Sequence, residues 1–353
     1  MLLPSTYSAA LLLLVLSMFA WGSWANTQKV AGKWRFELFY YDYSFGVMLC
    51  AIVAAFTFGS LIPRELTFQD NLLIAAKRQM AYAFAGGAVF NLANMLLVAA
   101  IAVSGMAVAF PIAIGLALVI GVVLNFSLNP QGNPALLFIG VFLVLAAIVV
   151  DAFAYSSYLD AQALLSKAKA PVDARGKPRV RSRGGAARGL ILCIVSGILM
   201  GLFYPLVEVG RQGDTGVAPY GLALLFGLGV LLSTLLYVPF FANFPVQGEP
   251  IQILEYFKGT RKQHLLGILG GTIWMVGAIA NFAAASTPAM VQIGPAISYA
   301  LGQGATLISA LWGLLVWHEF KGADERVKLL LGVMIGLFVL GLGLISIAPL
   351  YAK

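Results

Sequence analysis

The sequence predicts an all-α polytopic membrane protein, with ten transmembrane helices arranged as two inverted five-helix repeats. Three observations support this fold class: the composition, ten long apolar runs, and a pattern that recurs in the second half. Of 353 residues, 61% are hydrophobic and 10% are charged, and the mean hydropathy is +0.92. These values exclude an ordinary soluble protein. The apolar runs are continuous rather than alternating, which disfavours a β-barrel.

The apolar runs have the length of membrane-spanning helices, because about 20 helical residues cross the ~30 Å hydrocarbon core of a bilayer. We expect spans at residues 4–25, 42–62, 80–102, 106–127, 134–155, 189–210, 218–241, 264–286, 290–317 and 327–349. No Lys or Arg precedes Lys29, so we interpret the first run as a span rather than a cleaved signal peptide. Cys50 and Cys193 lie inside spans and indicate neither a disulfide nor a metal or redox site.

One long basic segment, residues 156–188, divides the chain into a first repeat at 1–155 and a second at 189–353. We interpret this segment as a cytoplasmic loop, with contact to lipid headgroups or a regulatory role as the alternative. The excess of Lys and Arg on cytoplasmic loops then sets the orientation. With both termini extracytoplasmic, all but five of the 22 basic residues face the cytoplasm. The expected location is the plasma or inner membrane of the cell.

The repeated pattern covers Gly86–Pro111 and Gly270–Pro295, which align without a gap and place Phe90 on Trp274. The second copy is offset from the first by five spans, an odd number, so the two should run antiparallel in the membrane. Inverted repeats of this kind are typical of alternating-access transporters, with the substrate site near the midplane between the repeats. Weaker echoes pair Gly22 with Gly201, and LFIGVF in span five with LLLGVM in span ten.

Polar and aromatic side chains at mid-span depth are the candidates for substrate binding, because lipid-facing surfaces tolerate few polar atoms. Asn91 and Asn94 share one helical face, and their amides could recognise a heterocycle or a sugar. An indole such as Trp274 could stack on a planar ring. Hydrogen bonds between helices and simple core packing are the alternatives for these residues. The first choices are Asn94, Trp274, Asn281 and Gln303; the second choices are Trp21, Asn91, Tyr204 and Tyr299.

Two carboxylates and two prolines complete the candidate machinery. Glu208 is the leading candidate for proton coupling and Asp151 the second, because a buried carboxyl group can exchange a proton near neutral pH. The alternatives are an interfacial pair of Glu208 with Arg211, and an Asp151 that faces water. Pro111 and Pro295 occupy equivalent places in spans four and nine, and are expected to act as hinges near the central cavity.

No motif of a soluble enzyme is present: GxxxxGK[ST], HExxH and GxSxG are absent, and the chain has only two His. We therefore expect no catalytic residue, no metal and no cofactor. The basic loop lacks interleaved aromatic residues, so nucleic acid is not an expected partner. The pairs Gly197/Gly201, Gly267/Gly271 and Gly332/Gly336 have GxxxG spacing, which indicates helix packing or contacts between copies of the chain. A homo-oligomer therefore remains open.

Several segments resemble known transporters. The stretch YDYSFGVMLCAIVAAFTFGS at 41–60 resembles the second span of ureide permeases, and Gly86-Gly87 followed by Asn94 fits the same family. Leu124-Asn125-Phe126 at the end of span four also fits. Residues 311–348, with Glu319 after span nine, are similar to the last two spans of the drug/metabolite transporter superfamily.

The resemblance implies a secondary active transporter: a proton-coupled importer of a ureide, purine or pyrimidine-type nitrogen heterocycle, such as allantoin, uracil or xanthine. Plant-type members carry a longer central loop with a stretch like a nucleotide motif, which this chain lacks. Related branches carry glucose, ribose or rhamnose, so a monosaccharide transporter is an alternative, as is an exporter of drugs or metabolites. A membrane enzyme or scaffold is disfavoured, because no clustered catalytic group is apparent.

Overall fold

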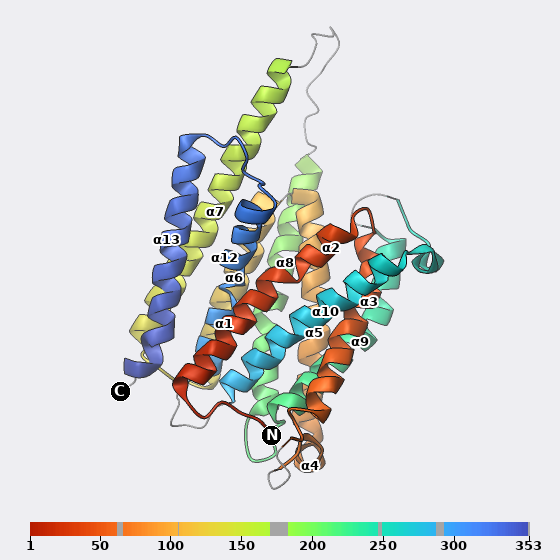
Figure 1. Ribbon diagram of the computed structural model, residues 1–353, viewed down its shortest axis with the longest axis vertical. Helices are drawn as coiled ribbons and strands as arrows, with labels where there is room; N and C mark the ends of the chain where they lie inside the picture. Colours follow the sequence, from red (N-terminus) through yellow and green to blue (C-terminus); the bar gives the residue numbers. More distant parts are fainter. Residues whose placement is uncertain (62–65, 105, 170–182, 246–248, 287–292, 352–353) are drawn as a thin grey trace.

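The computed structural model describes residues 1–61, 66–104, 106–169, 183–245, 249–286 and 293–351, and every regular element in these ranges is helical. The long helices run side by side, with both termini at one end of the bundle (Figure 1). The longer elements are α1 Tyr7–Ser23, α3 Phe36–Phe56, α5 Lys77–Ser104, α6 Met106–Leu128, α7 Pro134–Lys169, α8 Arg183–Arg211, α9 Pro219–Asn243, α10 Arg261–Ala285 and α13 Glu325–Ile347. The shorter elements are α2 Ala25–Ala31, α4 Phe68–Ile74, η1 Ile253–Lys258, α11 Pro295–Gly302, α12 Ala305–Leu311, η2 Trp312–Val316 and η3 Ala348–Tyr351.

Nine stretches of the described chain are long and apolar enough to cross a membrane, which makes this a multi-pass membrane protein. They correspond to nine of the ten predicted spans, with α1–α2 forming the first and α11–η2 the ninth. The predicted fourth span coincides with α6, whose described apolar part, Ile112–Leu128, is shorter. The ten-span prediction is therefore compatible with the described helices.

Two boundaries differ from the sequence-based expectation. The second span was expected at 42–62 but α3 covers Phe36–Phe56, because Glu37 and Asp42 in its first turns have partners that allow a polar helix start. The backbone turns at 57–60 instead of continuing as helix. The helices also extend into the predicted linker 156–188, since α7 continues to Lys169 and α8 begins at Arg183. The central part of that linker, 170–182, lies outside the described residues.

The bundle has two distinct ends. We call the end that holds residues 1–6, α4 and the connections 129–133 and 212–218 the terminal end, and the end that holds α2, residues 32–35, η1 and residues 317–324 the linker end (Figure 1). The helix α5 runs from the terminal end to the linker end, whereas α10 runs in the opposite direction. The antiparallel arrangement expected of the two matching stretches is thus present in these helices.

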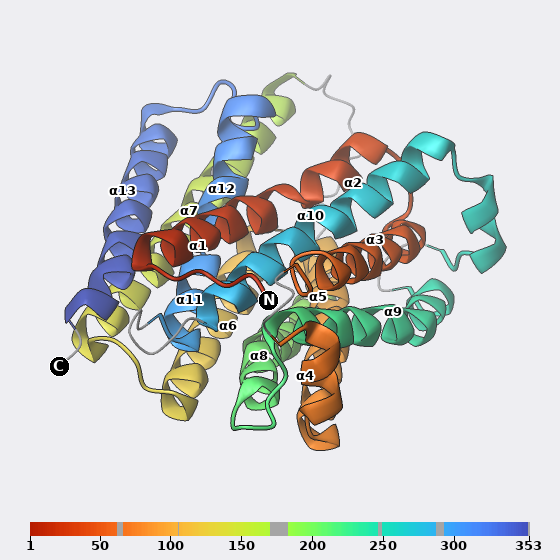
Figure 2. The same ribbon diagram turned by 60° about the horizontal axis from the view of Figure 1, so that its bottom comes forward.

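The partners of α5 and α10 correspond. The helix α5 packs against α8 and α9, and α10 packs against α1–α2 and α3, lying between α1 and α3 in both views (Figure 1 and Figure 2). A Cβ atom on Gly87 would overlap the carbonyl oxygen of Phe226 in α9, and one on Gly271 would overlap that of Tyr43 in α3. Glycine is required at both places because two backbones meet there.

The weaker echo between Gly22 and Gly201 has the same structural form. A Cβ atom on Gly22 would lie 2.5 Å from the Cβ of Ile308, and one on Gly201 would lie 2.8 Å from the Cβ of Ile120. The helix α1 therefore packs closely against span nine at Gly22, just as α8 packs closely against α6 at Gly201. These corresponding contacts are compatible with two inverted repeats. Gly332 and Gly336, by contrast, have no neighbouring atom within 4 Å of an added Cβ, so their GxxxG pair is available on the outer face of α13.

Candidate functional site

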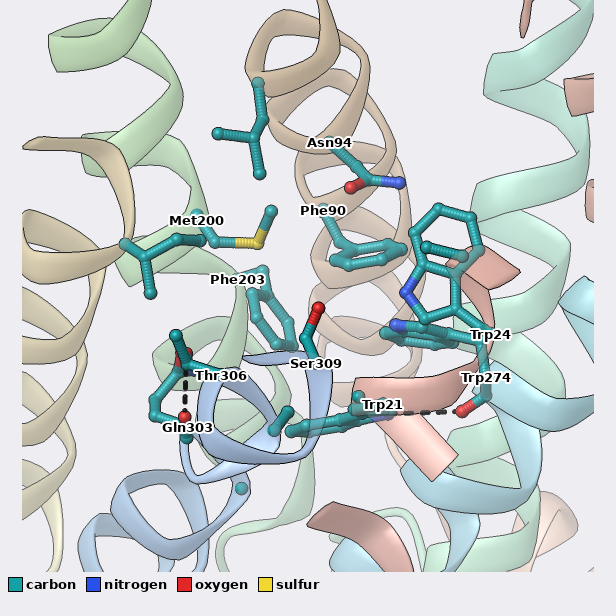
Figure 3. A pocket seen from close by; sticks show the side chains of 16 residues that line it. Trp21, Trp24, Phe90, Asn94, Met200, Phe203, Trp274, Gln303, Thr306 and Ser309 are labelled. Atoms are coloured by element: carbon teal, nitrogen blue, oxygen red, sulfur yellow. Dashed lines mark hydrogen bonds between the residues drawn. The ribbon is translucent and has the colours of Figure 1, made fainter. Parts of the chain in front are cut away.

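A cavity of about 170 Å³ lies at the centre of the bundle, between α1, α5, α8, α10 and the α11–α12 connection. Figure 3 shows its lining, in which Phe90, Trp24, Trp274 and Trp21 gather on one side with Asn94 beside them, and Thr306 and Gln303 lie on the other. Four of the eight predicted substrate-binding residues line it: Trp21, Asn94, Trp274 and Gln303. The structure therefore brings together residues from both predicted repeats.

The aromatic wall is a stack of rings. Trp274 lies between neighbours, with ring centroids 4.2 Å from Phe90 and 5.7 Å from Trp21, and it is only 4% exposed. The indole nitrogen of Trp21 donates a hydrogen bond of 3.1 Å to the backbone oxygen of Trp274, which fixes the orientation of the Trp21 ring. Trp21 and Trp24 are only half-buried, so they offer the aromatic surface on which a planar ligand could stack.

Three polar side chains face the cavity with unused hydrogen-bonding capacity. The Asn94 amide nitrogen donates to the Tyr40 hydroxyl at 2.9 Å, and none of the described hydrogen bonds uses its carbonyl oxygen. The side-chain amide of Gln303 and the hydroxyl of Ser309 are likewise not used by any described hydrogen bond. Together they supply the Asn94 carbonyl oxygen as an acceptor, the Gln303 amide as both donor and acceptor, and the Ser309 hydroxyl. A small solute with N–H and C=O groups fits this combination.

Span nine is interrupted at the cavity. The helix α11 ends at Gly302, a turn follows at Gln303–Gly304, and α12 begins at Ala305. The dihedral angles of Gln303 and Gly304 stay in the right-handed helical region, so this is a tightened turn within one span rather than an unwound segment. A Cβ atom on Gly302 would lie 2.5 Å from a ring carbon of Trp21 and 3.1 Å from the Asn281 amide nitrogen. Because Gly302 has no side chain, the backbone at this turn can lie close to the Trp21 ring.

The other four predicted binding residues lie outside the cavity lining. Asn281 is fully buried, accepting from the Tyr204 hydroxyl at 2.5 Å and donating to the Ser298 backbone oxygen at 3.0 Å. Tyr299 donates to backbone oxygens of α6 and α8. On their helices, Tyr204, Asn281 and Tyr299 lie closer to the terminal end than the cavity-lining residues do. They therefore form a packed polar and aromatic layer that separates the cavity from that end.

Asn91 is also buried, one turn from Asn94 on α5. Its amide nitrogen donates to the backbone oxygen of Val230 at 3.1 Å and to the hydroxyls of Ser233 and Thr234 at 2.7 and 3.0 Å. These bonds join α5 to α9. The packing alternative stated for the asparagines therefore describes the contacts of Asn91, whereas the cavity position of Asn94 fits a role in binding.

A second cavity, of about 350 Å³, adjoins the first at Ala25, Thr306 and Ser309 and lies toward the linker end. We call it the vestibule. Asp151 lines it, together with Tyr155, Trp317 and Glu319. The Lys29 ammonium is 2.5 Å from a Glu319 carboxylate oxygen and 4.3 Å from the centroid of the Trp317 ring. The central cavity therefore leads to the linker end through a charged, aromatic-lined space.

Glu208 lies at the other end. Its side chain is 1% exposed, and its carboxylate accepts from the Arg211 guanidinium at 2.6 Å and from the Asn129 amide at 3.2 Å. The pairing with Arg211 is present, but in a buried rather than a solvated setting. Asn129 follows α6, so this network joins α8 to the connection after α6 at the terminal end.

The two predicted hinge prolines differ in their settings. Pro111 lies within α6, and Pro295 is the first residue of α11, where a proline is tolerated because its missing N–H has no helical partner. The interruption of span nine falls instead at 303–304, and 287–292 are outside the described residues. The hinge role of both prolines stays a prediction.

Several lining residues were not among the predicted ones. Phe90, Phe203 and Trp24 belong to the aromatic wall and its surroundings, and Thr306 and Ser309 to the polar side. The Gly302-Gln303-Gly304 sequence was the available signal for the break. In the described part of the chain, no group of three or more His, Cys, Asp or Glu side chains could hold a metal ion.

Two family models match different parts of the chain: one described as ureide permease at residues 39–184, and one described as sugar transport protein at 246–348. Ureide permease 2 of Arabidopsis thaliana is 25% identical over 388 residues, covering 94% of this chain and 94% of its own. Ureide permease 1 of the same plant is 23% identical and covers 98% of this chain and 97% of its own. The chain is a homologue of the ureide permeases.

The resemblance stated from the sequence is thus confirmed over nearly the whole chain. A solved crystal structure of another protein has the same fold, with a TM-score of 0.57 over 94% of this chain and 96% of that chain, at 15% identity. The relatives are named permeases, and these matches support a membrane transporter rather than an enzyme.

Proposed function

We propose that this ureide permease homologue is a secondary active transporter that carries a small planar nitrogen heterocycle, of the ureide, purine or pyrimidine type, through the central cavity. The observation that carries the proposal is the composition of the cavity wall. Trp21 and Trp24 expose ring surface beside Asn94, Gln303 and Ser309 in a space of about 170 Å³. Stacking of a base on an aromatic side chain is worth about 1–3 kcal/mol in proteins that bind single-stranded nucleic acid.

The hydrogen-bonding groups suit such a ligand. Ureides and nucleobases carry alternating N–H donors and C=O acceptors along a ring edge, which amide side chains can pair with. The Asn94 carbonyl oxygen accepts an N–H, and the Gln303 amide can both donate and accept. Buried polar groups of this kind discriminate strongly against ligands that leave them unpaired.

A monosaccharide is the second candidate substrate. The match of residues 246–348 to the sugar transport model favours it, and amides and indoles also bind sugars. This part of the chain contributes Trp274, Gln303 and Ser309 to the cavity. The heterocycle is preferred because aromatic rings make up so much of the wall.

The mechanism we propose is alternating access with inward proton coupling. The linker end, with its excess of basic residues, faces the cytoplasm of the cell, and the termini lie outside. The cavity adjoins the vestibule at the linker end and is separated from the terminal end by the Tyr204–Asn281 layer. Asp151 lines the vestibule and Glu208 lies near the terminal end, so the two predicted proton carriers serve opposite ends of the pathway.

A thermal-shift screen of the purified protein tests the substrate class, because a ligand that binds only the folded state stabilises it by about 2.7 kcal/mol at 100 times its Kd. We expect allantoin, uracil or xanthine to raise the Tm of the wild type and to raise the Tm of Asn94→Leu clearly less. Gln162→Leu, on the exposed part of α7, is the matched control and should respond like the wild type. Stabilisation by glucose or rhamnose with no response to any heterocycle would overturn the first choice.

A further inference from the structure

A buried group of three side chains lies at the linker end of α3, outside both cavities. Asp42 of α3 is 2% exposed, and its two carboxylate oxygens have different partners. One accepts from the Tyr256 hydroxyl of η1 at 2.6 Å, and the other lies 2.8 Å from Nδ1 of His264 near the start of α10. The His264 side chain is 25% exposed, so water at the linker end can reach the imidazole.

The counter-charge of Asp42 distinguishes it from Glu208. A carboxylate inside a membrane span needs a positive partner, because burial of an unpaired charge is costly. Glu208 has the permanently charged Arg211 at 2.6 Å. The described hydrogen bonds and ion pairs of Asp42 offer only His264 for this role, and an imidazole is charged only after it binds a proton.

Tyr256 does not supply the positive charge that the Asp42 carboxylate needs. Burial and the hydrogen bond to Asp42 raise the pKa of Tyr256 above its ordinary value, so its hydroxyl stays protonated and donates. The rings of Trp34 and Tyr256 pack against the imidazole, with centroids 5.7 and 4.6 Å away. Charged groups on the surrounding elements are the Arg35–Glu37 pair, Glu255 and Lys258 of η1, and Arg261 and Lys262 of α10. None of these makes a described hydrogen bond or ion pair with Asp42 or His264.

We propose that the Asp42–His264 pair is a further site that binds a transported proton, beside the candidates Asp151 and Glu208. Without the proton, Nδ1–H of the neutral His264 imidazole donates to the Asp42 carboxylate, and the pair carries one negative charge. A proton that binds Nε2 turns the pair into an imidazolium–carboxylate ion pair with no net charge. In the conformation seen here, the proton exchanges with water at the linker end. This inference rests on the proposed proton-coupled transport and adds a pair of residues to those that take part in it.

The pair is placed to communicate with the substrate cavity. It bridges α3 and α10 at an interface where a Cβ on Gly267 would meet Asp42, and one on Gly271 would overlap Tyr43. Further along α10 lies Trp274, and on α3 the Tyr40 hydroxyl accepts from Asn94. A change in the attraction between Asp42 and His264 therefore acts on the two helices that hold the aromatic wall and the Asn94 amide.

Transport in proteoliposomes tests the coupling. An inward gradient of one pH unit can drive about tenfold accumulation per proton, and we expect Asp42→Asn and His264→Gln to lose this accumulation while retaining substrate exchange. His264→Arg, with a fixed charge, should also exchange without accumulating. Lys262→Gln, an exposed neighbour, is the matched control and should accumulate normally. Normal gradient-driven accumulation by both Asp42→Asn and His264→Gln would overturn the proposal.

A second measurement needs no substrate and so separates this inference from the proposed function. The chain has two His, and His318→Gln leaves His264 as the only one for NMR of labelled imidazole. We expect the His264 ring signals to change as the imidazole gains a proton on acidification, and Asp42→Asn to alter that change. A ring that stays in one form, or a titration that Asp42→Asn leaves unchanged, overturns the proton site even if heterocycles bind. Titration without heterocycle binding would instead overturn only the substrate proposal.

Discussion

Phe90 and Trp274 occupy the same position in the two copies of the sequence repeat, and in the structure their rings stack on each other with centroids 4.2 Å apart. The contact marks the place where α5 and α10, running in opposite directions, come together at the cavity. The replacement of phenylalanine by tryptophan in the second copy adds an indole to the wall on one side only.

The rings of this wall should divide into those that bind substrate and those that hold the bundle together. Trp21 is half-buried and Trp274 is 4% exposed. We expect Trp21→Ala to weaken heterocycle binding by about 1–3 kcal/mol with a small change in stability. Trp274→Ala should instead lower the free energy of unfolding by about 3–5 kcal/mol. Titration calorimetry and the Tm of each variant check this division, which fails if the two substitutions have the same effects.

Asn94 should recognise the substrate through its carbonyl oxygen, because its amide nitrogen already donates to Tyr40. We expect Asn94→Leu to raise the Kd for the heterocycle by about tenfold or more, since a hydrogen bond lost in a buried site costs about 1–3 kcal/mol. Tyr40→Phe keeps the Asn94 side chain and removes only its partner, so it should weaken binding less. A larger loss for Tyr40→Phe than for Asn94→Leu in the same titration would contradict this role.

The closest backbone contacts should tolerate no side chain. We expect Gly87→Ala and Gly271→Ala each to prevent folding or to lower the Tm sharply, because the added Cβ would overlap the carbonyl oxygens of Phe226 and Tyr43. Gly332→Ala is the control: its added Cβ meets nothing within 4 Å, and alanine favours a helix by about 0.5–1 kcal/mol over glycine. Equal Tm values for the three variants would show that the helices can separate at no cost.

The span pattern could be predicted from the sequence because hydrophobic length acts locally along the chain. The break in span nine could not, since Gly302 and Gly304 are two of 38 glycines and helical and broken forms share the same composition. Half of the predicted binding residues line the cavity. Asn281 and Asn91 do not, because a buried asparagine carries the same sequence signal whether its partner is a substrate or a neighbouring helix.

The Asp42 site was missed for a related reason. Its partners His264 and Tyr256 lie more than 200 residues away, and only packing of α3 against α10 brings them together. The repeat itself offers a signal in retrospect. Aligned on the contacts of Gly87 and Gly271, the positions of α9 and α5 that correspond to Asp42 and His264 hold Leu225 and Met80. The charged pair therefore exists where α3 meets α10 and has no counterpart where α9 meets α5.

Glu208 can be tested as a proton carrier separately from its part in the ion pair with Arg211. We expect Glu208→Gln to lose proton-driven uptake and to spare exchange. Because Gln leaves the Arg211 charge without its carboxylate, this variant should also be less stable, by up to about 3–5 kcal/mol for a buried pair. The double variant Glu208→Gln/Arg211→Gln removes both charges and should recover stability. If it also recovers driven uptake, Glu208 serves only to neutralise Arg211 at the terminal end. If driven uptake stays lost in a stable protein, measured by counterflow and by Tm in the same preparation, the carboxylate itself takes part in coupling.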